Sequence, residues 1–173
     1  MPNELMNVTA VALPSRSGIS RLHPTLNLAD AFAIGLPSGA SRDPETLARF
    51  IFAHQPAWIG LLTSVRDAIV ARFGLKTAKH LATLAGDANA RRVGIFKVYS
   101  VGADEVVVGE DDKHLDFRVS VLCSATADGR QLTVSTVVHC HNLLGRAYLL
   151  VIAPIHRLVV QASLRRAAQI GWP

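Results

Sequence analysis

Hydrophobic and polar positions alternate along the second half of the chain, from Val93 to Asn142. Alternation with a period of two is typical of strands that bury one face. The apolar runs VGIFKVYSV, VVVGE, HLDFRVSVLCSA and QLTVSTVVHCHN are joined by the short polar segments GADE, EDDK and ADGR. The pattern therefore predicts an antiparallel meander with tight turns.

The first half of the chain contains one short apolar run and two helical patterns. The run ADAFAIGLP, residues 29–37, predicts a first strand that stops at a Pro-Ser-Gly turn. Asp43 followed by Pro44 predicts the start of a helix that ends before Pro56. In the next helix, apolar residues at spacings of three and four predict one apolar face, formed by Trp58, Leu62, Val65, Ile69 and Phe73, with Gly74 at the end. The stretch from 76 to 92 fits either a short helix or a loop.

Residues 143–169 predict a long C-terminal helix with an apolar stripe at Ile155, Leu158, Val159 and Ala162. Pro154 fits either the start of this helix or, as we prefer, a kink inside it. Residues 1–27 show no period and predict a loosely ordered arm or a segment packed on the surface. The expected architecture is α+β, a single domain over residues 28–173. In it a curved antiparallel sheet wraps around the C-terminal helix, with two tandem helices after the first strand.

Composition narrows the function classes. The chain has 173 residues, half of them hydrophobic, and a net charge of +5. The basic residues are scattered and form no block with aromatics, which argues against nucleic-acid binding. No secretory signal is evident and no uninterrupted apolar run reaches ~20 residues, so we expect a cytoplasmic protein without membrane insertion. Cys123 and Cys140 lie in strand patterns and are expected to be reduced core residues.

The turns predict which strand residues share a face. A turn centred on Asp128-Gly129 pairs Phe117 with Cys140 on an apolar face. A turn centred on Asp111-Asp112 gives the same division of faces, and a slip of one residue would expose the apolar set. Four polar residues are therefore predicted on the face away from the helix: His114, Asp116, Arg118 and His141. We expect these four residues to form a solvated or interface face, and the alternative is an acid–base site or an anion clamp.

The opposite face predicts a small-molecule cavity with a few polar groups. The candidates are Lys97, Tyr99, Thr136, Asn142, Tyr148, His156 and Arg157. Tyr99 and Lys97 belong to this set if Tyr99 opposes Val108. Each could equally be a rim residue or a buried, satisfied polar group. The pair His139 and His141 lacks a recurrent metal-ligand spacing, and no nucleotide-binding glycine motif is present, so no metal or cofactor is predicted.

The stretches DDKHLDFRVSV, LTVSTVVHCHNLLGRAYL and PIHRLVV resemble a bacterial protein family, the domain of unknown function 2867 family. The family resembles the helix-grip superfamily of START and Bet v 1-like proteins. The resemblance covers about residues 29–166. It implies a domain that occurs alone or fused behind a nucleotide-binding domain like that of short-chain dehydrogenases. It carries over no activity and no catalytic residue.

Three functions are compatible with these predictions. The first is a binding domain for a small hydrophobic or amphipathic molecule. The second is an enzyme of the cyclase, hydratase or lyase kind that uses a cavity His or Tyr as acid or base. The third is an interaction domain for an oxidoreductase partner. Fold alone does not choose among them, although binding without catalysis is favoured, and the oligomeric state is not predicted.

Overall fold

The computed structural model describes residues 7–72, 77, 83 and 91–173. Its elements, in chain order, are β1 (Thr9–Ala10), β2 (Leu28–Leu36), α1 (Pro44–Ala53), α2 (Ala57–Ala71), β3 (Arg92–Val93), β4 (Phe96–Val101), β5 (Glu105–Asp111), β6 (Leu115–Thr126), β7 (Gly129–Cys140) and α4 (Leu143–Ile170). The predicted first strand, tandem helices, meander and C-terminal helix are confirmed. The predicted helix end at Phe73 and Gly74, and most of the ambiguous segment from 76 to 92, lie outside the described residues.

The strands form one antiparallel sheet in the order β1-β2-β7-β6-β5-β4-β3. The first long strand, β2, therefore lies beside the last strand, β7, and Leu28 pairs with Val138 across them. The chain from β3 to β7 is a meander in which each strand pairs with the next. The fold is α+β, with an open antiparallel sheet and a long helix at the C-terminus.

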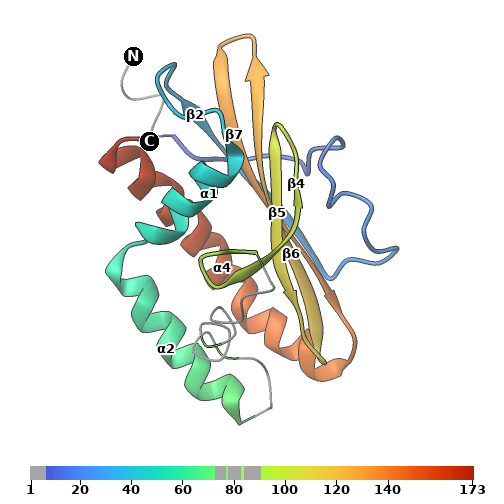
Figure 1. The fold of residues 1–173 in the computed structure, drawn as a ribbon. Helices are drawn as coiled ribbons and strands as arrows, with labels where there is room; N and C mark the ends of the chain where they lie inside the picture. The colour runs from blue at the N-terminus through green and yellow to red at the C-terminus, as the bar shows by residue number, and fades with distance from the viewer. Residues whose placement is uncertain (1–6, 73–76, 78–82, 84–90) are drawn as a thin grey trace.

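The helices lie on one side of the sheet and the N-terminal segment lies on the other (Figure 1). We call the helix-covered side the inner face. It carries the main core, in which Leu47 of α1 and Leu164 of α4, both fully buried, pack with Val106 and Val121 of the sheet. A smaller cluster extends this core toward the start of α4 and contains Leu149. The burial of these apolar side chains is the main force that holds α1 and α4 on the sheet.

α1 begins as the Asp-Pro signal predicts. The Asp43 carboxylate accepts hydrogen bonds from the Thr46 amide at 2.9 Å and from the Thr46 hydroxyl, and the hydroxyl bond is the main reason that the pKa of Asp43 is lowered. In the same turn, the buried Glu45 carboxylate accepts from Arg49 at 2.7 Å and also from Arg91. The bond from Arg49 is the largest cause that lowers the pKa of Glu45. This ion-pair group joins the start of α1 to the chain just before β3.

The strand register differs from the predicted one by even steps. Thr126 pairs with Gly129, so Ala127 and Asp128 form the loop of the β6–β7 hairpin, and Gly129 lies at φ +130°. Phe117 consequently faces Val138, two residues from its predicted partner Cys140. The β5–β6 pairing differs by four residues in the same way. Because side chains alternate with a period of two, an even shift leaves the division into faces unchanged.

The predicted apolar faces of α2 and α4 are only partly covered by the rest of the molecule. α4 runs from Leu143 to Ile170 with Pro154 inside it, so Pro154 does not start the helix. Of the predicted stripe, Leu158 is 63% exposed, whereas Ile155, Val159 and Ala162 are half-buried and Leu164, outside the stripe, is fully buried. In α2, Trp58 and Val65 are likewise exposed, whereas Ile59 is buried.

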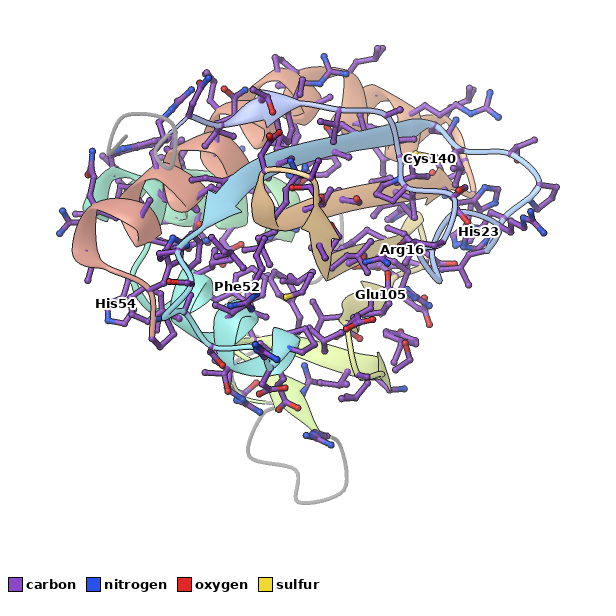
Figure 2. The ribbon with its side chains drawn as sticks, turned by 90° about the horizontal axis from the view of Figure 1, so that it is seen from above. Arg16, His23, Phe52, His54, Glu105 and Cys140 are labelled. Carbon is purple, nitrogen blue, oxygen red and sulfur yellow. The ribbon has the colours of Figure 1, made fainter. Side chains whose placement is uncertain are left out.

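After β1, the N-terminal segment packs against the outer face of the sheet through Leu13, Ile19 and Leu26, whereas Val8 before β1 joins the main core of the inner face. Ile19 is fully buried against Val107 and Val137. The Glu105 carboxylate of β5 accepts from the Ser17 hydroxyl at 2.5 Å and from the Gly18 amide at 2.9 Å. Figure 2 shows Arg16, His23 and Glu105 at one side of the molecule, well away from Phe52 of α1 and from His54, which follows that helix.

Candidate functional site

On the inner face, strand β2 carries one carboxylate among apolar residues. On β2, Asp30 shares its face with Leu28, Phe32 and Ile34, all of which are buried. The Asp30 side chain is 10% exposed. Both of its carboxylate oxygens are shielded from solvent and make no hydrogen bond. Buried polar groups are nearly always paired, so this carboxylate is an exception that requires an explanation.

Three further polar side chains surround Asp30. Thr136 of β7 is its cross-strand neighbour and is 3% exposed. From α4, His156 Nε2 lies 3.5 Å from Asp30 Oδ1, and Arg157 Nε lies 3.5 Å from Asp30 Oδ2. These separations are within ion-pair range, but the atoms are not aligned for hydrogen bonds, and Thr136 Oγ1 and His156 Nε2 are also buried without a partner. We call Asp30, Thr136, His156 and Arg157 the inner polar cluster.

Apolar side chains flank the inner polar cluster along both strands. Leu28 and Phe32 precede and follow Asp30 on its face of β2, and Val134 and Val138 do the same for Thr136 on β7. The cluster is therefore a small polar island between sheet and helix. Such an arrangement suits a ligand with one polar group and an apolar body.

The remaining helix-side candidates have partners of their own. The Tyr148 hydroxyl accepts a hydrogen bond from Arg66 Nε at 2.7 Å, which ties α2 to α4. Asn142 is exposed and caps α4, because its Oδ1 accepts from the Gly145 amide at 2.9 Å. Its amide nitrogen lies 2.9 Å from His114 Nδ1. Tyr148 and Asn142 thus have structural contacts that account for their positions.

The predicted inward position of Lys97 and Tyr99 is wrong. A β-bulge between Val98 and Ser100 shifts the register, so Val98, not Tyr99, pairs with Val108. Tyr99 packs on the outer face instead, with the buried residues Ile19, Val107 and Val137. Lys97 lies near the same ring, with Nζ 5.2 Å from the Tyr99 centroid.

Tyr99 belongs to an outer-face group with Arg118 and Asp111. The Arg118 guanidinium carbon lies 3.5 Å from the Tyr99 ring centroid, and Arg118 Nη2 donates to Asp111 Oδ1 at 2.7 Å. The Tyr99 hydroxyl donates to Asp111 Oδ2 at 2.9 Å. Burial and the bond to Asp111 raise the pKa of Tyr99. Burial alone would raise the pKa of Asp111, but the hydrogen bonds from Arg118 and Tyr99 outweigh it, so the pKa of Asp111 is lowered. A charge-balanced, closed group of this kind is typical of structure rather than of acid–base chemistry.

The other motif residues also lie on the outer face. His141 Nε2 is 3.0 Å from Asp116 Oδ2, and the Asp116 side chain is 16% exposed. His139 stacks on His23 of the N-terminal segment with ring centroids 4.8 Å apart. Part of this face is therefore covered by the chain's own N-terminal segment, and His114 and His141 lie at its open end near the start of α4. Whether they bind a partner stays a prediction.

The cysteines and metal-binding residue types form no second centre. Cys123 and Cys140 are buried and free, and burial raises the pKa of both thiols. A thiol with a raised pKa is a poor nucleophile at neutral pH. Within residues 7–72 and 91–173, no group of three or more His, Cys, Asp or Glu side chains is arranged to hold a metal ion.

The comparison with protein families gives one match. A model for the family described as "Protein of unknown function (DUF2867)" matches residues 22–163, most of the chain. The chain belongs to this family. No curated protein and no solved structure matches it.

Membership in DUF2867 confirms the predicted resemblance to a family of unknown function, and it assigns no role to any residue. The matched range includes β2 and most of α4, so all four members of the inner polar cluster lie within it.

Sequence reasoning found Thr136, His156 and Arg157 but missed Asp30. The signal was present, because Asp30 is in phase with Leu28, Phe32 and Ile34 in an alternating strand. Asp30 was not selected because residues 29–37 were interpreted as one apolar run and not as an alternating strand.

A second buried acid, Glu110 on β5, was also missed. It is 8% exposed and lies on the inner face 3.5 Å from Arg92. Like Asp30, it occupies an inward phase of its strand.

Proposed function

We propose that this DUF2867 domain has a helix-grip fold and binds a small hydrophobic or amphipathic molecule between its sheet and α4. The element order supports the fold: one strand, two helices, a meander and a long helix, with the first strand closing beside the last. In such a fold the C-terminal helix lies across the concave face of the sheet. The ligand would replace part of the contact between helix and sheet.

The observation that carries this proposal is the set of buried, unpaired polar atoms on Asp30, Thr136 and His156. Leaving a buried polar group without a hydrogen bond costs roughly 1–3 kcal/mol. A ligand with a hydroxyl, amine or amide N–H would donate to Asp30 and satisfy it. The flanking apolar residues would then contact the apolar body of the ligand.

Native mass spectrometry tests the proposal by comparing the purified protein with its denatured mass. We expect a stoichiometric extra mass that is lost on denaturation and that is reduced in Asp30→Leu. The control is Asp116→Leu, which removes a strand carboxylate from the outer face and should retain the extra mass. A bare mass for the wild type, together with no change in melting temperature across a panel of amphipathic alcohols and amines, would reject the proposal.

A second function is favoured by one specific contact. His156 is an inward histidine beside a buried carboxylate, an arrangement used in general acid–base catalysis. On this alternative the domain is an enzyme of the cyclase, hydratase or lyase kind. The substitution His156→Gln separates the two: a binding domain would lose affinity only, whereas an enzyme would retain ligand and lose turnover.

A further inference from the structure

α4 has an exposed apolar face from Leu143 to Leu158. Leu143, Leu150, Val151 and Leu158 are 79%, 80%, 66% and 63% exposed. Their spacings of seven and eight residues place them on one side of the helix, and we call them the exposed stripe. The opposite side of α4 packs on the sheet through Leu149 and Leu164. One side of this helix therefore supplies core and the other presents apolar surface to the exterior.

The charges on α4 are all of one sign. Over its 28 residues the helix has Arg146, Arg157, Arg165 and Arg166 and no Asp or Glu. Arg146 and Arg157 are exposed and lie beside the exposed stripe by helical spacing. An apolar stripe on a helix whose only charges are arginines is complementary to the surface of an anionic membrane.

Self-association through the stripe is disfavoured by the same charges. A two-fold antiparallel pairing centred between Leu150 and Val151 would also bring Leu143 against Leu158 of the second copy. It would place Arg146 within two residues of the second copy's Arg157, on the same flank. With no acid on either helix, these like charges would repel.

A membrane-spanning role is disfavoured by the packing of α4. The helix is long and apolar enough to span, with an 18-residue window of mean hydropathy 1.6. However, one side of it is tied to the sheet, and His156 and Arg157 meet Asp30 in its middle. A helix held in this way can present only its outer side to lipid.

We propose that the exposed stripe docks the domain on the surface of an anionic lipid bilayer, with α4 parallel to the membrane plane. Leu143, Leu150, Val151 and Leu158 enter the boundary between headgroups and acyl chains. Arg146 and Arg165 meet the lipid phosphates. This inference is independent of the ligand proposed for the inner polar cluster.

Vesicle co-sedimentation of the full chain tests the inference. The vesicles are phosphatidylcholine alone, or the same lipid with about a third replaced by phosphatidylglycerol, a share that gives a clearly negative surface. We expect sedimentation with the anionic vesicles, loss of that binding at high salt, and little binding to phosphatidylcholine alone.

Two sets of variants separate the apolar and charge contributions. Leu150→Glu with Val151→Glu should abolish sedimentation, whereas Leu22→Glu, an exposed leucine of the N-terminal segment, should not change it. Arg146→Gln with Arg165→Gln should weaken binding roughly fivefold for each arginine, because each is worth about one kcal/mol near an anionic surface. The matched control is Arg21→Gln with Arg42→Gln, two exposed arginines outside α4.

Several outcomes would overturn the inference. One is the absence of binding to anionic vesicles at low salt. Another is binding that survives both sets of α4 variants while their circular dichroism stays native. A third is a dimer in analytical ultracentrifugation that Leu150→Glu with Val151→Glu converts to a monomer, which would assign the stripe to a second copy of the chain.

Discussion

Replacing Asp30 by leucine should stabilise the domain in the absence of ligand. The carboxylate is 10% exposed, and neither oxygen makes a hydrogen bond. Its ionic partners lie at 3.5 Å, and one of them, Arg157, is 53% exposed and so is weakened by solvent screening. Burying a carboxylate costs several kcal/mol, and imperfect pairs of this kind repay only part of that cost.

Leucine has the same branched shape as aspartate, with methyl groups in place of the carboxylate oxygens, and would extend the apolar row of Leu28, Phe32 and Ile34. Replacement of a buried ion pair by a well-packed apolar group is often neutral or stabilising by about 1–4 kcal/mol. Because His156 keeps an unpaired ring nitrogen in the variant, we expect the lower part of that range, about 1–2 kcal/mol. The same variant should lose the proposed ligand.

Urea unfolding at pH 7 measures this difference, with the slope of the transition compared to exclude a change in unfolded surface. The control is Asp116→Leu on the outer face, where the carboxylate is 3.0 Å from His141 and accepts from the Asp112 amide. Loss of these contacts should destabilise that variant by about 1 kcal/mol. If Asp30→Leu instead lowers stability by more than 1 kcal/mol, the Asp30 carboxylate is a structural group and the case for a ligand there fails.

Three further predictions concern the scaffold. Gly145→Ala should destabilise the domain by about 1–3 kcal/mol, because the added Cβ would lie 2.3 Å from the carbonyl oxygen of His114. Gly60→Ala, where nothing lies within 4 Å of the added Cβ, should instead stabilise the domain by up to ~1 kcal/mol, and thermal unfolding of both variants measures the two effects. Glu105→Ala removes the carboxylate that anchors the N-terminal segment, so limited proteolysis should cut that segment first in the variant, and equal cutting in wild type would contradict the contact. Glu45→Gln should cost about 1–2 kcal/mol at pH 7. The lowered pKa of Glu45 means that its contribution is complete above the unfolded value near 4.5 and is lost as pH falls through the folded pKa, so wild type and variant should converge in acid-dependent urea unfolding.

The sequence was sufficient to predict the five longer strands, α1, α2, α4 and the two faces of the sheet, but not the two-residue strands β1 and β3. Alternation decides which face a strand residue occupies, and that decision survives even shifts in register, as the pairing of Phe117 with Val138 shows. The exact register was not predictable from the Asp-Gly pair, because Gly129 follows the two-residue loop and is not at its centre. Tyr99 was misplaced because a β-bulge inserts one residue and reverses the alternation beyond it.

The candidate site was predicted only in part. Alternation placed Thr136 on the inner face, and the predicted C-terminal helix made His156 a residue that could reach the same space. Their meeting with Asp30 depends on β2 lying beside β7, a long-range pairing that no local pattern encodes. The side of α4 that faces the sheet also depends on tertiary packing, because the helix is apolar on both sides and its periodicity is therefore weak.

The neighbouring positions of β2 and β7 set the order in which the domain can be completed during synthesis. Leu28 pairs with Val138, so β2 must wait for more than one hundred residues of chain before its partner exists. At ordinary translation rates this takes roughly 5–20 s, during which an apolar strand has no neighbour on that edge. Bringing β2 and β7 together also costs the entropy of closing a long loop, and folding that depends on such non-local contacts is slow. The nascent domain is thus most open to aggregation before β7 leaves the ribosome, and holdase chaperones are expected to act on it in that interval.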